Sequence, residues 1–554
     1  MAATATASKS TQITPAPTPI TEVSSLTPVP GRPQEQFEVQ EAGTAEEDDV
    51  VYPSGLKLWL NLISFMAASY IRGLDLTIVS VVVPSLTNEF KTINDIGWYG
   101  AAYGMTSSAT VFFFGKVYTV FDVKRTYLSS FIVFCLGSVI CTFAQSSKMF
   151  IFGRALAGFG SAWQGAGMVL QVNMMFPLAK RPTYLGVLNF TGSAGLVSAP
   201  LIGGLLTQRF GWRACFGINI PLNTLCFAFS AYSMQSTTGN SGTNLSLREK
   251  LKRLDLLGSL IFVPALTCLL MALQWGGIKY GWRDPRIIAL LTLSALLLAV
   301  FTYLQYYLGD RATVPPRIVM QRSVLAGAWF LACCDGTLAV TEQYLTIYYQ
   351  GVRGLSPARS GLLGVGLVAG LCMSSLVSGY MTTWLGYYSV TMVATTVLAP
   401  IASGLLTTLS LDSQVSKAAG LLGMLGFSLG LGMSGPLVAL SCVLGTSDIS
   451  IGSAVLGFGA GMGSAVFNSA AALLFQNRLA DEVRRSAPGT NVTTIEHAGL
   501  SEIRNKLGEA RLKQVLIGYD KAVVQTLYLP LALTLLTAVG SSLTEWRSVK
   551  KKQS

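Results

Sequence analysis

Long apolar runs recur along almost the whole chain, and they constrain its fold more than any other feature. A helix needs roughly 20 apolar residues to cross a bilayer, and fourteen segments of about that length follow residue 57. Charged residues make up only 12% of the sequence, against about 25% in a soluble domain. We therefore predict an all-α polytopic membrane protein with spans at 58–84, 97–118, 126–145, 150–172, 184–206, 214–234, 256–276, 287–308, 324–346, 360–384, 387–409, 418–442, 449–475 and 525–545.

The distribution of basic residues predicts the orientation. An even number of spans places both termini on one side, and the connections after spans 2, 4 and 6 are rich in Lys and Arg. Because positive residues mark the cytoplasmic side, we expect both termini in the cytoplasm. Residues 1–55 have an acidic, Pro-, Ser- and Thr-rich composition typical of a disordered tail, and 547–554 form a basic tail.

One connection is much longer than the others. Residues 476–524 follow thirteen spans, so we expect an extracellular loop there. Apolar residues at helical spacing indicate one or two short amphipathic helices within it. Asn491 begins an Asn-Val-Thr triplet, which predicts a glycosylation site.

The chain lacks the residue patterns of several other protein classes. It has no nucleotide-binding loop, which excludes an ATP-driven pump and makes an enzyme improbable. Its single histidine, His497, and its scattered cysteines make no metal motif, so we expect no metal and no cofactor. The net charge of +12 indicates contact with anionic lipid of the bilayer rather than with nucleic acid.

The fifth span is unusually rich in small residues. Glycines allow helices to approach closely, and a proline removes one backbone donor and bends the helix. Two interpretations remain: static packing, which suits Gly186 alone, or a hinge or moving interface, which the remainder of the block favours. The block consists of Gly186, Gly195, Ala199, Pro200, Gly203 and Gly204.

Seven other segments carry recognisable patterns. They are Leu74-Asp75-Leu76-Thr77-Ile78-Val79 with Pro84, Gly97-Trp98-Tyr99-Gly100, Gly115-Lys116-Val117-Tyr118, Gly153-Arg154 through Gly160, Gly211-Trp212-Arg213, Phe216 through Pro221, and Tyr344 through Gln350 with Ser356-Pro357 and Ser360-Gly361. In this order they resemble the major facilitator superfamily, specifically its fourteen-span drug:H⁺ antiporters from fungi. The resemblance covers roughly residues 56–545 and includes the small-residue block, which resembles the antiporter motif of that family.

The resemblance implies an architecture and a function. Residues 56–235 and 323–546 would form two six-helix bundles, with two extra helices in the linker 236–322. The substrate would sit between the bundles of a monomer that works by alternating access. The implied activity is export of drugs, toxins or secondary metabolites in exchange for protons across the plasma membrane, with the vacuolar membrane as the alternative location. Siderophore transport, basic amino-acid transport and a transporter-like membrane sensor are the other functions considered.

The first cytoplasmic loop resembles the gating loop of the superfamily. Its candidate residues depart from the family pattern, because Thr119 occupies the usual acid position and the nearest acid is Asp122. Ala199 likewise replaces a glycine of the antiporter motif. The gating-loop residues are Gly115, Lys116, Asp122, Lys124 and Arg125.

Five ionisable residues fall within predicted spans, where charge is costly and points to function. Arg72 and Asp75 are three residues apart, so they share a helix face and are predicted to pair, either structurally or for proton coupling. Arg154 either reaches the interface or, as its family counterpart implies, takes part in proton transfer. Asp335 and Glu342 share a face of the ninth span, with Asp335 the deeper candidate and a solvated position equally open for Glu342.

Polar and aromatic residues of the spans are candidates for the substrate cavity. Aromatic rings stack on flat organic molecules, although they also serve as interface belt or core. Amides bind substrate or join helices. The candidates are Trp98, Tyr103, Gln164, Gln171, Asn189, Tyr344 and Tyr348.

Overall fold

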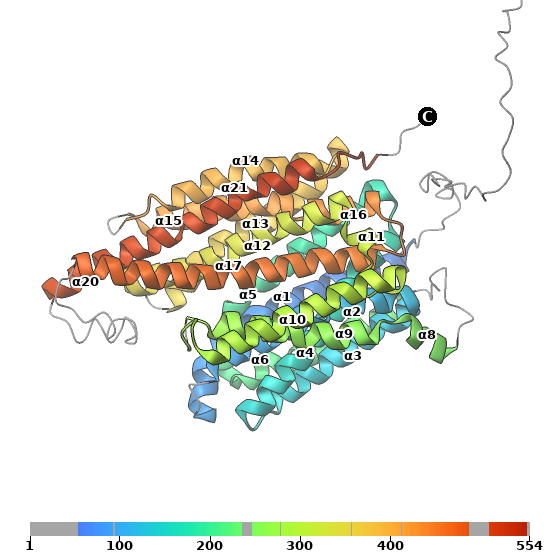
Figure 1. The fold of residues 1–554 in the computed structure, drawn as a ribbon, viewed down its shortest axis with the longest axis horizontal. Coiled ribbons are helices and arrows are strands. Elements are labelled where there is room, and N and C mark those ends of the chain that lie inside the picture. The colour runs from blue at the N-terminus through green and yellow to red at the C-terminus, as the bar shows by residue number, and fades with distance from the viewer. Residues whose placement is uncertain are drawn as a thin grey trace, which may run out of the picture. The chain divides into compact units, whose positions relative to one another are not determined.

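Helices form almost all of the secondary structure, and long ones lie side by side (Figure 1). The computed structural model describes residues 54–91, 95–234, 246–277, 279–355, 357–410, 413–486 and 509–550. In these ranges there is no β-strand, only two isolated bridges. A bilayer offers no water to the backbone, and a helix satisfies its own backbone hydrogen bonds. Long apolar segments of this kind therefore fold as helices.

The first half of the described chain contains the helices of predicted spans 1 to 6. They are α1 (Leu56–Phe90), α2 (Ile96–Val120), α3 (Val123–Thr142), α4 (Ser147–Met175), η1 (Leu178–Lys180), α5 (Arg181–Phe210), α6 (Arg213–Gly217) and α7 (Asn219–Ser233).

Three elements follow before the second half: α8 (Leu247–Arg253), α9 (Leu256–Trp275) and α10 (Pro285–Leu308). The second half begins after two short turns, η2 (Gly309–Arg311) and α11 (Pro316–Val319). Its helices are α12 (Arg322–Ile347), η3 (Tyr348–Val352), α13 (Pro357–Leu385), α14 (Ser389–Leu406), α15 (Val415–Met433), α16 (Gly435–Val443), α17 (Ile449–Ser486), α20 (Glu509–Thr526) and α21 (Tyr528–Leu543).

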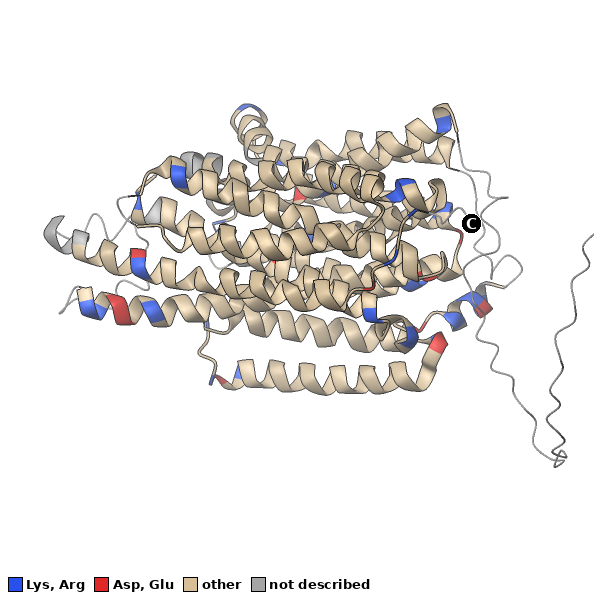
Figure 2. Ribbon diagram, turned by 90° about the horizontal axis from the view of Figure 1, so that it is seen from above, with Lys and Arg blue, Asp and Glu red and all other residues tan. Residues whose placement is uncertain are grey.

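Polar residues just before the apolar runs cap the first turns of several helices. Asp122 accepts the backbone N–H of Arg125 at the start of α3, and Asp255 accepts that of Gly258 at the start of α9. Such side chains satisfy the donors that the first turn leaves without a partner. Most charged residues lie near the two ends of the helices, and the middles of the helices carry few (Figure 2).

Among the described residues, eleven helices are long and apolar enough to cross a membrane, and α5 makes a twelfth if its two parts are counted as one span. Those parts, Leu178–Ala199 and Leu201–Phe210, meet at an angle of 45° around Pro200, where a proline is expected to bend a helix. The predicted spans on α2 and α4 are helical but fall below the hydropathy of the others. The count of fourteen spans therefore stays a prediction.

The helices pack in two groups. In the first, α1 lies against α5 and α7, and α4 lies against α2 and α3; in the second, α12 lies against α17 and α21, and α15 lies against α13 and α14. The groups meet mainly where α5 packs on α13 and α2 packs on α17. Helices α9 and α10 pack on each other, and α9 also contacts α2 and α17.

The long connection differs from the sequence prediction. Helix α17 does not end near residue 475 but continues to Ser486, and α20 begins at Glu509 and packs against it. One face of α20 buries Val515, Tyr519 and Val523, so this part is the amphipathic helix that the apolar spacing predicts. Residues 487–508, with Asn491 and His497, lie outside the described ranges.

Candidate functional site

A cavity of about 1020 Å³ lies between the two groups of helices. Its walls come from α1, α2, α4 and α5 on one side and from α12, α13, α15, α16 and α17 on the other. Helix α9 completes the wall with Leu270, Leu273 and Gln274. Such a volume is at the upper end of the range for small-molecule sites, roughly 300–1,000 Å³.

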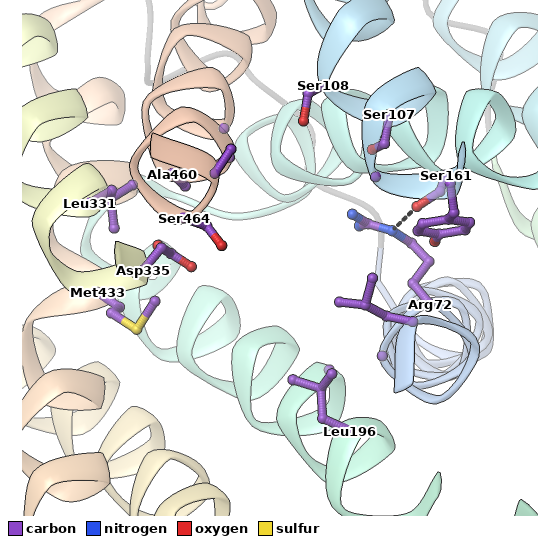
Figure 3. Close-up of a pocket in the computed structure, with 18 of the residues that line it drawn as sticks. Arg72, Ser107, Ser108, Ser161, Leu196, Leu331, Asp335, Met433, Ala460 and Ser464 are labelled. Atoms are coloured by element: carbon purple, nitrogen blue, oxygen red, sulfur yellow. Dashed lines mark hydrogen bonds between the residues drawn. The ribbon is translucent and has the colours of Figure 1, made fainter. Parts of the chain in front are cut away.

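Two charged side chains line this cavity, and they stand on opposite walls (Figure 3). Arg72 on α1 donates from Nε to Ser161 Oγ at 3.1 Å. Asp335 on α12 makes no hydrogen bond or ion pair with any of the described residues. Both belong to the set predicted from sequence, and each comes from a different group of helices.

A buried ion pair lies behind the cavity wall. Arg154 Nη1 donates to Asp75 Oδ2 at 2.6 Å, and both side chains are 1% exposed. Asn219 donates from Nδ2 to the other carboxylate oxygen at 2.8 Å. The guanidinium also covers the ring of Tyr103 at 4.6 Å, and this ring lines the cavity.

The structure corrects two details of the predicted charges. The partner of Asp75 is Arg154 and not Arg72, because a contact between helices replaces the contact predicted along α1. Arg154 is completely buried, so it does not reach the interface. Glu342 is exposed near the end of α12 and does not line the cavity with Asp335.

Only two of the seven predicted cavity residues line it, Tyr103 and Asn189. Asn189 donates from Nδ2 to Ser434 Oγ at 3.0 Å, which joins α5 to the second group. The other five pack elsewhere, against neighbouring helices or within the core. They are Trp98 (edge-to-face on Trp275), Gln164 and Gln171 (buried), Tyr344 (packed on Phe475) and Tyr348 (donating to Ser410 O).

Hydroxyl side chains make up much of the polar lining, and the sequence analysis did not select them. Serine is common in membrane helices, where it also bonds its own backbone. Its position toward a cavity therefore leaves no pattern in a single sequence. The serines of the lining are Ser69, Ser107, Ser108, Ser161, Ser193, Ser375, Ser434, Ser464 and Ser469.

The small-residue block of α5 serves close helix packing rather than the cavity surface. A Cβ on Gly195 would lie 2.1 Å from Tyr70 O of α1, and one on Gly203 would lie 2.9 Å from the Ile78 side chain. Ala199 is fully buried in the same contact region. Gly204 has open space, with nothing within 4 Å.

Gly186 belongs to a different contact, between the two groups. A Cβ there would lie 2.6 Å from Ser375 O of α13, and Thr183 and Thr383 share a hydrogen bond of 2.8 Å one turn away. On the other side, Ser450 of α17 donates to Gly115 O of α2 at 2.9 Å. These contacts lie at the end of the bundle where α1 begins and α21 finishes, which we call the terminal end. Val549, after α21, donates to Gly386 O at the same end.

The remaining gating-loop residues also lie at the terminal end. Lys116 is buried and donates to Asp310 O at 3.1 Å, whereas Lys124 donates to Met234 O at 2.6 Å. Asp122 caps α3 through Arg125, so it has a structural partner in its own helix.

An arginine joins the inserted segment to the second group at the same end. Arg317 contacts Asp310 and Asp448, each at 2.7 Å. These two acceptors raise the pKa of Arg317, with the hydrogen bond to Asp448 as the main cause. Through Asp310 the arginine lies next to Lys116, so α2, α11 and the start of α17 are connected at one place.

Two groups of membrane-spanning helices with a cavity between them are the arrangement of a membrane transport protein. No cluster of three or more potential metal ligands occurs in the described ranges.

The chain belongs to the Major Facilitator Superfamily, whose family model matches residues 65–473. Among curated proteins it is similar to the efflux pump roqT of Penicillium rubens, with 36% identity over 87% of this chain and 89% of that protein. The efflux pump aflT of Aspergillus parasiticus is 35% identical over 90% of this chain and 98% of its own length. The chain thus groups with fungal efflux pumps of the superfamily.

Two solved structures share the fold. The human organic anion transporter MFSD10 has a TM-score of 0.55 at 11% identity, over 87% of this chain and all of that one. The proton:xylose symporter XylE has a TM-score of 0.58 at 11% identity, over 89% and 97% of the two chains. The helical architecture predicted from the sequence is therefore confirmed.

Proposed function

We propose that this protein exports small organic molecules in exchange for protons by alternating access. The observation that carries the proposal is the cavity between the two groups of helices, together with the carboxylate of Asp335 on its wall. The names of the fungal relatives support export as the direction of transport.

The contacts between the groups favour one conformation of the transport cycle. They close the terminal end through Gly186 with Ser375 and through Gly115 with Ser450. The cavity-lining part of α17, from Gly457 to Ala472, lies further from that end. If basic residues mark the cytoplasmic side, the closed end faces the cytoplasm and the structure represents an outward-facing state.

We propose that Asp335 is the carboxylate that binds a proton and substrate in turn. It faces the cavity without a partner in the described ranges, so either a proton or a donor group of the substrate can occupy it. Asp75, in contrast, has both oxygens held by Arg154 and Asn219. Because both of its oxygens already have donors, Asp75 offers no free acceptor to a substrate, and we assign it a structural role in the bundle.

The test compares Asp335→Asn with Glu342→Gln, a matched change on the same helix outside the cavity. Each variant is expressed in a drug-sensitive yeast, and cellular accumulation is measured for a panel of neutral, zwitterionic and cationic organic compounds. We expect the wild type and Glu342→Gln to lower the accumulation of at least one compound. A protonophore should abolish the effect, and Asp335→Asn should lack it.

Two results would contradict the proposal. If overexpression of the wild type changes the accumulation of no compound, the protein is not an exporter. If Asp335→Asn exports as well as the wild type and responds equally to the protonophore, the proton is exchanged elsewhere.

A further inference from the structure

The charges of the cavity limit the chemistry of its substrate. Arg72 and Asp335 are the only charged side chains among the described residues that line it. Figure 3 shows the guanidinium and the carboxylate pointing into the space between the two walls. The remainder of the lining is apolar or neutral, as at Leu196 and Met433.

The position of Arg72 leaves its guanidinium available to a ligand. Only Nε has an acceptor, Ser161 Oγ, and the two Nη atoms have none among the described residues. A Cβ on Gly165 would lie 3.0 Å from Nη2, so this glycine provides the room in which the guanidinium lies. A guanidinium keeps its charge at any physiological pH and matches the two oxygens of a carboxylate.

If proton and substrate bind to Asp335 in turn, this limits the charge of the substrate group that faces Asp335. Antiport requires proton and substrate to weaken each other's binding, and this coupling is reciprocal. A proton on Asp335 makes the cavity more positive by one charge, which weakens binding of a cation and strengthens binding of an anion. The group of the substrate that faces Asp335 is therefore cationic or a hydrogen-bond donor.

Arg72 sets the opposite requirement on the other wall. A lipophilic cation without an acidic group would meet the fixed positive charge of Arg72 in an environment that screens it weakly. The same charge attracts a carboxylate or another acidic group. A molecule that carries both groups satisfies both walls, whereas a simple cation satisfies only one.

We propose that the substrate is a dipolar organic molecule, with a cationic or donor group at Asp335 and an acidic group at Arg72. Arg72 is then the residue that excludes simple lipophilic cations. This proposal rests on the proton exchange at Asp335 proposed above, and it adds the class of substrate. The hydroxyls of Ser107, Ser108 and Ser464 accept or donate along the body of such a molecule.

Rhodamine B and its ethyl ester test this selectivity because they share one aromatic body. Rhodamine B is a zwitterion, and the ester lacks the acidic group and is a monocation. The purified full-length protein is reconstituted into liposomes, and the uptake of each dye driven by a pH gradient is measured. The variants are Arg72→Gln, Arg72→Lys and, as a control outside the cavity, the exposed Arg286→Gln.

We expect the wild type, Arg72→Lys and Arg286→Gln to prefer rhodamine B. Arg72→Gln should lower the ratio of rhodamine B transport to ester transport by about tenfold or more, the scale of one ionic contact. It should also transport the ester faster than the wild type does. Misfolding cannot produce this gain, so the result does not depend on unaltered stability.

The inference is overturned if Arg72→Gln leaves the ratio of the two dyes unchanged, or if the wild type prefers the ester. It is also overturned if the wild type transports neither dye. Each of these outcomes leaves the proposal of proton-coupled export standing, because that proposal is judged on the compound panel and on Asp335→Asn.

Discussion

The side chains of Asp75 and Arg154 form the most completely buried ion pair of the described chain. The two residues are 79 positions apart in the sequence and lie on different helices, α1 and α4. If one partner of such a pair is removed, the other charge stays buried without compensation, which typically costs about 3–5 kcal/mol. The pair therefore stabilises the arrangement of α1 and α4 only as long as both partners are present.

This pair predicts a separation between stability and transport. Asp75→Asn should lower the thermal unfolding midpoint of the purified protein strongly, because the Arg154 charge stays buried. Asp335→Asn should leave the midpoint close to that of the wild type, because Asp335 has no partner among the described residues. Thermal unfolding in detergent measures both variants; equal midpoints would show that the buried pair is not the stabilising contact.

A second prediction concerns pH at the end of α1. Arg213 and Trp212 donate to Glu89, and these hydrogen bonds lower its pKa, with that from Arg213 the larger cause. Because the pKa is lower in the folded protein, the ionised carboxylate stabilises the fold at pH values above its ordinary pKa of 4.5. This stabilisation is lost as the pH falls through the folded pKa. The pair is partly exposed, so the contribution is below about 1 kcal/mol.

Comparison of the wild type with Glu89→Gln over a range of pH measures this contribution. The wild type should have the higher unfolding midpoint near neutral pH, and the difference should shrink as the pH falls below 4.5 and vanish once it passes below the folded pKa. A difference that stays constant with pH would mean that the carboxylate charge of Glu89 contributes nothing.

The sequence supplied the charged residues of the site but not their pairing. Burial of charge in an apolar span is visible in one sequence, so Arg72, Asp75, Arg154 and Asp335 could be selected. Pairing depends on which helices become neighbours, and the spacing of Arg72 and Asp75 along α1 could not reveal Arg154. Serines gave no signal for the cavity, because hydroxyls in membrane helices commonly bond their own backbone.

At the scale of elements, the contact between α1 and α5 depends on glycines at particular positions. Gly195 lies against the backbone of Tyr70, whereas Gly204, in the same motif, has open space around it. The motif in the sequence does not distinguish the two, since both are glycines of one block.

These two glycines provide a matched pair of variants. Gly195→Ala should force α1 and α5 apart, with a cost of about 1–3 kcal/mol typical of an overpacked contact, and should reduce transport. Gly204→Ala should behave as the wild type. Unfolding midpoints and accumulation assays measure both; a harmless Gly195→Ala would mean that the helices do not approach this closely.

Apolar runs in the sequence located the helices well, because hydropathy follows the bilayer and the helix satisfies its own backbone. The extent of α17 could not be found in this way. Its hydropathy falls after residue 475, but packing of Leu479 and Val483 against α20 continues the helix to Ser486. Contacts with another element decide the length there, and a single sequence does not contain them.

At the scale of the whole molecule, the contacts between the two groups of helices predict a conformation that can be trapped. Thr183 Oγ1 and Thr383 Oγ1 lie 2.8 Å apart across α5 and α13. Cysteines at both positions should form a disulfide under mild oxidation, because side chains this close meet its geometry. The bond should hold the terminal end closed and stop transport, and a reductant should restore it.

Single variants Thr183→Cys and Thr383→Cys serve as controls, because the nine native cysteines are free thiols. Oxidation should leave transport by either single variant unchanged. Full transport by the oxidised double variant, with the disulfide verified by mass spectrometry, would exclude opening between these two helices during the cycle.

Helix α9 has a consequence for how proteins built on this plan can diversify. It contributes Leu270, Leu273 and Gln274 to the cavity wall, yet it does not belong to the contacts of α5 with α13. Because α9 contacts α2 and α17, it takes part in only one of the two places where the groups meet. Substitutions on its cavity face can reshape the chamber without touching the contact of α5 with α13, so an evolving lineage can try new cargo preferences there while that contact stays constant.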